Sequence, residues 1–210
     1  INDVKMMIRI LLILLISYIP APCISQPQKS NNLFILPLDI PIYLSGNFAE
    51  LRSGHFHSGI DIKTNGTEGE KLLSIQDGYV SRIKVQTNGY GKSLYINHPG
   101  GYTSLYGHLS DYNDIITDYV KKYQYRNKTH TLDIYPGKNE IRIKKGELIG
   151  FTGNSGSSSG PHLHFEIRNA ANQHPTNVLK YYSEITDNIP PRLYSFYTYQ
   201  FRGTGKDRVI

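Results

Sequence analysis

The feature that most constrains this chain is the stretch at 160–167, in which polar and apolar residues alternate strictly from residue 162 on. Two histidines and an acid alternate with apolar residues: His162, His164 and Glu166 with Leu163, Phe165 and Ile167. A two-residue period is typical of a half-buried β-strand, so the apolar set should face a core and both imidazoles the opposite side. Neutral imidazole binds metals and also carries protons. Two histidines alone are also common on the exposed face of a sheet edge, so the stretch needs partners elsewhere.

A second histidine-rich stretch lies upstream, at residues 52–62. His57 and Asp61 are four residues apart, but Gly54 and Gly59 disfavour a stable helix, so we expect a loop that leads into a strand. Two imidazole nitrogens and one carboxylate oxygen would make a three-ligand set. Catalytic zinc commonly has three protein ligands and keeps its fourth position for water. The residue pattern leaves open which downstream histidine completes the set.

A third piece is a histidine at the end of a tyrosine-rich strand pattern. The three motifs, in chain order, are His57-Ser58-Gly59-Ile60-Asp61, Tyr106-Gly107-His108 and His162-Leu163-His164. Each motif is weak alone, but as a set they resemble the lysostaphin-type (LytM-type) zinc metallopeptidases, which cut peptidoglycan cross-links. The resemblance covers roughly residues 35–180, most of the chain. Its main departure is an insert after the second motif that is longer than in short family members.

The resemblance implies roles for five residues. It implies His57, Asp61 and His164 as ligands of one Zn²⁺ ion, and His108 and His162 as catalytic histidines that do not bind the metal. It also implies the reaction, which is hydrolysis of a peptide stem or cross-bridge of peptidoglycan by a water that the ion activates. We therefore expect a zinc metalloendopeptidase whose partner is a peptidoglycan peptide.

The beginning of the chain has the pattern of an export signal. Basic residues precede a short apolar run at 10–19, too short for a transmembrane helix, which needs about twenty residues. A basic start, an apolar centre and a small-x-small end predict a secretory signal peptide over residues 1–25. A flexible leader at 26–34 would follow. We expect an exported protein of the periplasm, cell envelope or extracellular space, with no stable membrane span.

Cysteine content and charge narrow the chemistry further. Cys23 is the single cysteine. It would leave with the signal peptide or, alternatively, carry a lipid anchor, although Pro22 suits an anchor poorly. A mature chain without cysteine has no disulfide, no cysteine ligand and no thiol nucleophile. The net charge of +6 would draw the protein to an anionic envelope. Scattered lysines and export argue against nucleic acid as a partner.

The remaining pattern predicts a mainly β fold. Short strand-like runs separated by Gly, Pro and Asn indicate an antiparallel β-sandwich or barrel-like core, and the resemblance implies the duplicated hybrid-motif type. We place the metallopeptidase domain at 35–184, with an insert at 111–145. The insert has one helix candidate at 114–123, which would be a flap over the substrate groove or the cover of a sheet edge. Residues 185–210 would be a linker and the start of a further β segment.

Several residues near the motifs keep two interpretations. Glu166 shares the histidine face and would either hold a ligand imidazole from behind or be a solvated strand end. Arg52 would either orient a carboxylate or cap a loop. The glycine- and serine-rich segment 152–160 should form a mobile wall beside His162. His98 precedes a Pro-Gly-Gly turn and fits no ligand spacing, so we leave it out of the site.

Two other functions are compatible with the same architecture. The turns near Asp77-Gly78 and at 144–147 resemble the paired hairpins of biotinyl and lipoyl carrier domains, which suggests a non-catalytic carrier or binding module. Carrier domains need a lysine at a hairpin tip, and no Met-Lys-Met occurs here. A degenerate family member that binds the wall or activates other wall hydrolases is the second alternative. Such members are expected to lack ligands, whereas here every ligand position is filled.

Overall fold

The computed structural model describes residues 33–185. The signal peptide predicted at 1–25, the leader apart from its last two residues, and the segment 186–210 lie outside the described residues. Within 33–185, no helix has the length and apolar character needed to cross a membrane.

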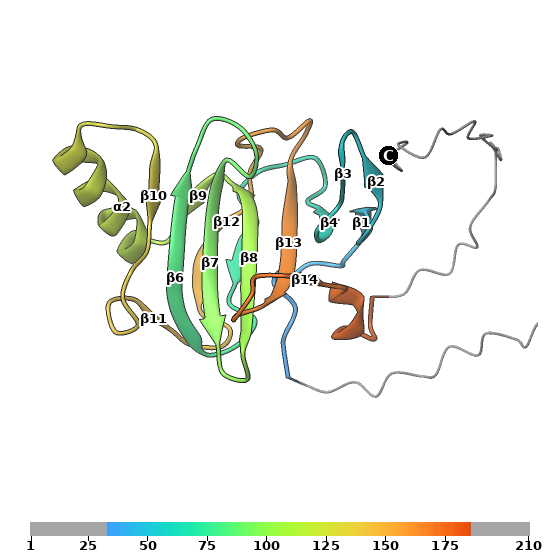
Figure 1. Ribbon diagram of the computed structural model, residues 1–210. Coiled ribbons are helices and arrows are strands. Elements are labelled where there is room, and N and C mark those ends of the chain that lie inside the picture. Colours follow the sequence, from blue (N-terminus) through green and yellow to red (C-terminus); the bar gives the residue numbers. More distant parts are fainter. Residues whose placement is uncertain (1–32, 186–210) are drawn as a thin grey trace, which may run out of the picture.

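A long antiparallel sheet forms the centre of the domain. Its strands are β1 Leu44–Gly46, β4 Ile60–Lys63, β6 Gly78–Val85, β7 Lys92–His98, β8 Tyr102–Leu109, β10 Leu132–Ile134, β11 Arg142–Ile143, β13 His162–Asn169 and β14 Pro175–Thr176. The order across the sheet is β1-β4-β13-β8-β7-β6-β10, with β11 on β6 and β14 on β13 (Figure 1). Strands β6, β7 and β8 form a meander, as their short Gly- and Pro-containing turns predict.

Two smaller sheets complete the β structure of the described residues. One has the order β5-β12-β9, formed by Lys71–Leu73, Leu148–Phe151 and Asp111–Tyr112, and the other pairs β2 Leu51–Arg52 with β3 His55–Phe56. The three-stranded sheet lies behind the long sheet in Figure 1, and the Tyr112 hydroxyl donates to the Ser93 carbonyl of β7 at 3.4 Å. The predicted mainly β fold with antiparallel sheets and one inserted helix is confirmed.

Strand β13 has the predicted two-residue period. Its three apolar side chains, Leu163, Phe165 and Ile167, are fully buried in the core. Burial of each such side chain favours folding by about 1.5–3 kcal/mol. On its polar face, His164 and Glu166 are also buried, while His162 and Arg168 are half-buried. The histidines therefore lie on an inner strand of the sheet, between β4 and β8.

The inserted helix α2 runs over Asp114–Asn127, longer than the predicted 114–123. The Asn113 side chain caps its first turn by accepting from the Ile116 N–H at 2.9 Å. Ile116 and Val120 are buried, and the helix contacts β9 and β10. Figure 1 shows it at the edge of the long sheet opposite β1. After β14, a single 3₁₀ turn follows, η1 Val178–Lys180.

Candidate metal centre

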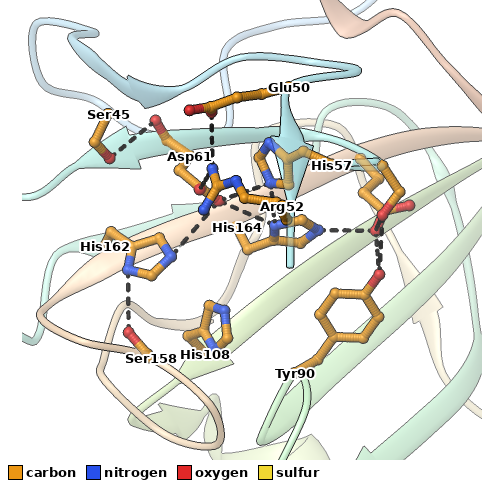
Figure 2. Close-up of polar contacts among 12 residues, drawn as sticks. Ser45, Glu50, Arg52, His57, Asp61, Tyr90, His108, Ser158, His162 and His164 are labelled. Atoms are coloured by element: carbon orange, nitrogen blue, oxygen red, sulfur yellow. Dashed lines mark hydrogen bonds and ion pairs between the residues drawn. The ribbon is translucent and has the colours of Figure 1, made fainter. Parts of the chain in front are cut away.

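The register of neighbouring strands brings the predicted site residues together. Asp61 of β4 lies directly opposite His164 of β13, so these two side chains and that of His162 share one face of the sheet. His57 belongs to the loop before β4, and His108 lies near the end of β8, the strand on the other side of β13. Figure 2 shows the five side chains gathered around one point.

Three donor atoms converge at the centre of this group. The distance from His57 Nε2 to His164 Nδ1 is 3.0 Å, and Asp61 Oδ1 lies 3.1 Å from the first and 3.0 Å from the second. All three residues are buried, with 4–6 % of their surface exposed. These atoms are close enough together to hold one metal ion. They belong to the three residues that the resemblance implies as ligands.

The outer nitrogens of both imidazoles are already engaged. His57 Nδ1 lies 2.8 Å from the carbonyl oxygen of Asn47, and His164 Nε2 lies 2.8 Å from Glu166 Oε1. Because these oxygens only accept, each outer nitrogen carries a proton, and each inner nitrogen faces the Asp61 carboxylate either with its lone pair or, when the ring is charged, with a second proton. The carboxylate and the two inner nitrogens therefore need a positive charge among them, either a proton or a metal ion.

The donor set fits zinc. Two imidazole nitrogens and one carboxylate oxygen are a common set for catalytic Zn²⁺, which leaves one tetrahedral position for water. Bonds of about 2.0–2.1 Å to a tetrahedral ion separate its ligand atoms by about 3.3 Å. The observed separations of 3.0–3.1 Å are close to that value. Small side-chain shifts would therefore be enough to admit the ion.

The charge balance of the group also favours a cation. Burial opposes ionisation of Asp61, but hydrogen bonds from the surrounding imidazoles outweigh it and hold the pKa of this carboxyl well below its usual value. Burial likewise opposes the charged form of His164, yet Asp61 and Glu166 raise its pKa. Arg52 Nη2 donates to Asp61 Oδ2 at 2.9 Å, which leaves Oδ1 to face the imidazoles. Of its two interpretations, Arg52 therefore orients a carboxylate.

A fully buried carboxylate, Glu166, supports His164 from behind. Its Oε1 accepts from Tyr90, Ser58 and His164 at 2.6, 2.7 and 2.8 Å, while Oε2 accepts from Arg168 Nε at 2.6 Å. Burial works against the charged form, but hydrogen bonds from His164 and Arg168 lower the pKa of Glu166 to about 2. The interpretation of Glu166 as a solvated strand end is wrong, because none of its surface is exposed.

Some residues of this network escape the sequence patterns. Tyr90 stacks on His164 with ring centroids 4.8 Å apart, and only its two flanking glycines mark its position in the sequence. Ser58 lies inside the first motif but has no obvious role without the structure. Arg168 could have been placed on the histidine face from the sequence, because it continues the alternation that starts at His162.

The two predicted catalytic histidines face each other beside the three donor atoms, with ring centroids 4.7 Å apart. His162 Nδ1 donates to the carbonyl of Gly160, and His108 Nδ1 to that of Ser155, both at 2.8 Å. Burial lowers the pKa of His108 to about 4, so it is neutral near pH 7. Burial opposes the charged form of His162 too, but Asp61, whose Oδ1 lies 3.6 Å from His162 Nε2, raises its pKa.

A β-bulge sets the direction of His108. Between the pairs Lys92–Leu109 and Leu94–Tyr106, β8 has one more residue than β7. His108 lies in this bulge with φ of 62°, a left-handed backbone conformation that costs a non-glycine residue about 1–3 kcal/mol. Bulges commonly re-aim a side chain near an active site. The strain therefore accompanies the residue that is predicted to act on substrate.

The segment 152–160 forms a wall of the cavity beside His162, as expected. Unlike the mobile wall that the sequence suggested, it is held by hydrogen bonds to the segment 89–92. The Ser157 N–H donates to Gly89 O at 2.8 Å, and Ser155 Oγ accepts from Lys92 N at 2.9 Å. The resulting cavity of about 380 Å³ contains all five predicted site residues. The histidine that was set aside, His98, lies outside it.

The location of α2 decides between a flap over the substrate groove and a cover of a sheet edge. No residue of the helix lines the cavity of about 380 Å³, and its contacts are with β9 and β10. In the described residues the helix therefore covers a sheet edge rather than the groove.

Comparisons with known proteins relate the chain to a family of peptidases. A model described as Peptidase family M23 matches residues 55–132 and 122–178. The chain is 31% identical over 127 residues to the DD-carboxypeptidase/endopeptidase Mpg of Neisseria meningitidis, covering 60% of this chain and 23% of that protein. It is 28% identical over 134 residues to lysostaphin of Staphylococcus simulans, covering 61% of this chain and 22% of that protein. The chain thus spans less than a quarter of the length of these relatives.

A solved structure of a zinc containing peptidase from Vibrio cholerae has the same fold. It superposes with a TM-score of 0.51 at 22% identity, over 78% of this chain and 41% of the other. At that identity the likeness concerns the fold alone.

Proposed function

The chain belongs to peptidase family M23, and on that premise we propose that it is a zinc metalloendopeptidase that hydrolyses peptide cross-links of peptidoglycan. The observation that carries this proposal is the convergence of three donor atoms, one each from His57, Asp61 and His164. The outer nitrogens of the two imidazoles are already engaged in hydrogen bonds. The relatives named above include a carboxypeptidase/endopeptidase and lysostaphin. We further propose export to the cell envelope, where such a substrate lies.

The three ligands and their supports prepare the site. When bound, zinc supplies a Lewis acid that polarises the scissile carbonyl and lowers the pKa of a water. Glu166 holds His164 in the tautomer that presents Nδ1, and the Asn47 carbonyl does the same for His57 Nε2. Arg52 keeps the Asp61 carboxylate oriented.

The two remaining histidines divide the proton chemistry. His108 is neutral near pH 7, and its Nδ1 is bound to the Ser155 carbonyl, so its Nε2 is free to accept a proton or a hydrogen bond. His162 has a raised pKa beside Asp61 and is suited to donate a proton to the leaving amine or to stabilise the oxyanion.

Two alanine variants test this division of roles. His164→Ala removes a proposed ligand, so it should lose bound zinc and hydrolysis together. His162→Ala leaves all three ligands in place, so it should keep zinc while losing hydrolysis. Zinc content of the purified variants and muropeptides released from purified sacculi, with and without a chelator, are the measurements. His130→Ala is the matched control, because this histidine is exposed and distant from the cavity.

The outcomes separate the proposal from its rivals. An empty metal site in His162→Ala together with a filled one in His164→Ala would reverse the assignment. A wild-type protein that binds no zinc and releases no fragments would instead favour a non-catalytic β module, the alternative suggested by the sequence.

A further inference from the structure

A second cavity continues the groove beyond His162. It measures about 580 Å³ and lies between the segment before β1, the end of β4 and the segment that leads into β13. Ser45, Ser159 and His162 line both this cavity and the one that holds the predicted site residues. A substrate bound across the centre can therefore extend into this second cavity.

One lysine is aimed into this extension by the sheet register. Lys63 lies directly opposite His162 on the neighbouring strand, and it lies two residues after Asp61. Alternation along a strand then puts Lys63 on the same face as Asp61, His162 and His164. Directly opposed side chains have Cβ atoms about 4.5–5.5 Å apart, so the Lys63 stem lies beside the His162 imidazole.

No described residue neutralises the ammonium of Lys63. Lys63 is exposed, and no acidic residue among 33–185 lines the cavity of about 580 Å³. Within residues 33–185 it forms no ion pair. Arg52, which lines the cavity of about 380 Å³, already pairs with Asp61 and Glu50 at 2.9 and 3.0 Å. Among the described residues that line the two cavities, Lys63 is thus the cation that is free to meet a ligand.

We propose that Lys63 is a specificity residue that pairs with a carboxylate of the bound peptide. Lys63 lies two residues along β4 from Asp61, a distance of about 6.6–6.8 Å. An extended peptide advances about 3.3–3.6 Å per residue. If the scissile bond lies at the metal centre, the carboxylate that meets Lys63 is therefore within about two residues of that bond. The carboxylate is either the peptide's own C-terminus or an acidic side chain. The inference rests on the proposed peptidase function, since it assumes that a peptide lies across the metal centre.

Matched substrates and variants test this role. The substrates are three soluble peptides that share one backbone. The first has its carboxylate at the C-terminus and the second on a side chain. The third has a carboxamide at both positions. Lys63→Met removes the charge and keeps the length, and Lys63→Arg keeps the charge. Lys71→Met is the control, because Lys71 is exposed on β5 in a different sheet.

The expected result is a loss of selectivity. The ratio of kcat/KM for a carboxylate peptide to kcat/KM for the carboxamide should fall about tenfold in Lys63→Met, mainly through KM. Lys63→Arg and Lys71→Met should keep most of the ratio. The preference of the wild type should weaken at high salt, because an exposed pair is screened. The carboxylate peptide whose kcat/KM ratio falls more in Lys63→Met identifies the source of the carboxylate.

A binding measurement separates this inference from the proposed function. Calorimetry on chelator-treated protein compares the affinities for the three peptides without turnover. If the wild type hydrolyses no peptide but Lys63→Met abolishes its preference for a carboxylate in binding, the peptidase proposal fails and the inference stands. An unchanged ratio in both kinetics and binding, in a Lys63→Met protein with normal zinc content and thermal unfolding, overturns the inference.

Discussion

Glu166 and Arg168 form an ion pair whose negative member is fully buried and also holds the His164 imidazole. A carboxylate with no exposed surface is costly to desolvate, and four donors offset that cost here. At the scale of single residues, such an outer partner decides the tautomer and direction of a ligand.

This arrangement predicts the effect of Glu166→Gln. The amide keeps the volume but loses the charge, and its NH₂ group would face the donors that Glu166 now accepts from. Zinc affinity should fall about 10- to 100-fold, because His164 loses its anionic partner. Competition with a chromophoric chelator measures it. Glu68→Gln, an exposed substitution, is the control. An affinity equal to that of the wild type would show that Glu166 only pairs with Arg168.

The site was predictable from sequence only in part, for a reason that lies in strand register. Alternation placed His162 and His164 on one face, but it did not say which of them meets Asp61. That choice depends on pairing between strands about a hundred residues apart in the chain, which puts Asp61 opposite His164 and Lys63 opposite His162. The family resemblance supplied the ligand roles, and those roles stay predictions until a metal is measured. Tyr90 was missed because its contact with Glu166 is purely tertiary.

At the scale of elements, the meander of β6, β7 and β8 and the helix of the insert were both predictable, because local periodicity and turn residues determine them. The end of α2 was not. Its last turn extends to Asn127, and Lys128 closes it in a left-handed conformation (φ 50°) without a glycine signal. Whether the helix covers a groove or an edge depends on the order of strands, which no local pattern contains.

Asn113→Ala tests the helix as a stabilising element. The substitution removes the cap on Ile116 and a bond from Asn113 Nδ2 to the Leu148 carbonyl. The free energy of unfolding in urea should fall by about 1–2 kcal/mol. Hydrolysis at a temperature where both proteins are folded should not change, because α2 lies away from the cavity. Lys121→Ala, on the exposed face of the same helix, should stay within about 0.5 kcal/mol. Reduced hydrolysis in Asn113→Ala would restore the flap interpretation.

At the scale of the whole molecule, His98 links stability to pH from a position outside the metal centre. Its Nδ1 donates to the Asp77 carbonyl at 2.9 Å, and its Nε2 lies 2.7 Å from Ser104 Oγ. Burial lowers the pKa of His98 below its ordinary 6.5, although the carbonyl of Asp77 opposes the shift. Below about pH 6.5 the unfolded chain therefore binds more protons at this residue than the folded one, and stability falls as pH falls.

The variant His98→Gln isolates this contribution. It removes the titration, so the stability advantage of the wild type over the variant should be larger at about pH 7.5 than at about pH 5. Urea unfolding at both values measures the difference. His130→Gln, at an exposed histidine, controls for the general effect of acid. An advantage that is the same at both values would show that the pKa of His98 does not differ between the folded and unfolded states.

The segment 152–160 has a consequence for how the range of accepted substrates can change. The backbone partners of both predicted catalytic histidines are carbonyls of this one segment, Ser155 for His108 and Gly160 for His162. The spacing of these two imidazoles is therefore set by a single stretch of backbone, while the side chains of Tyr43 and Ser159 are exposed at the rim of the neighbouring cavity. Evolution or protein engineering can therefore vary the side chains at the rim without moving the backbone that holds the two histidines.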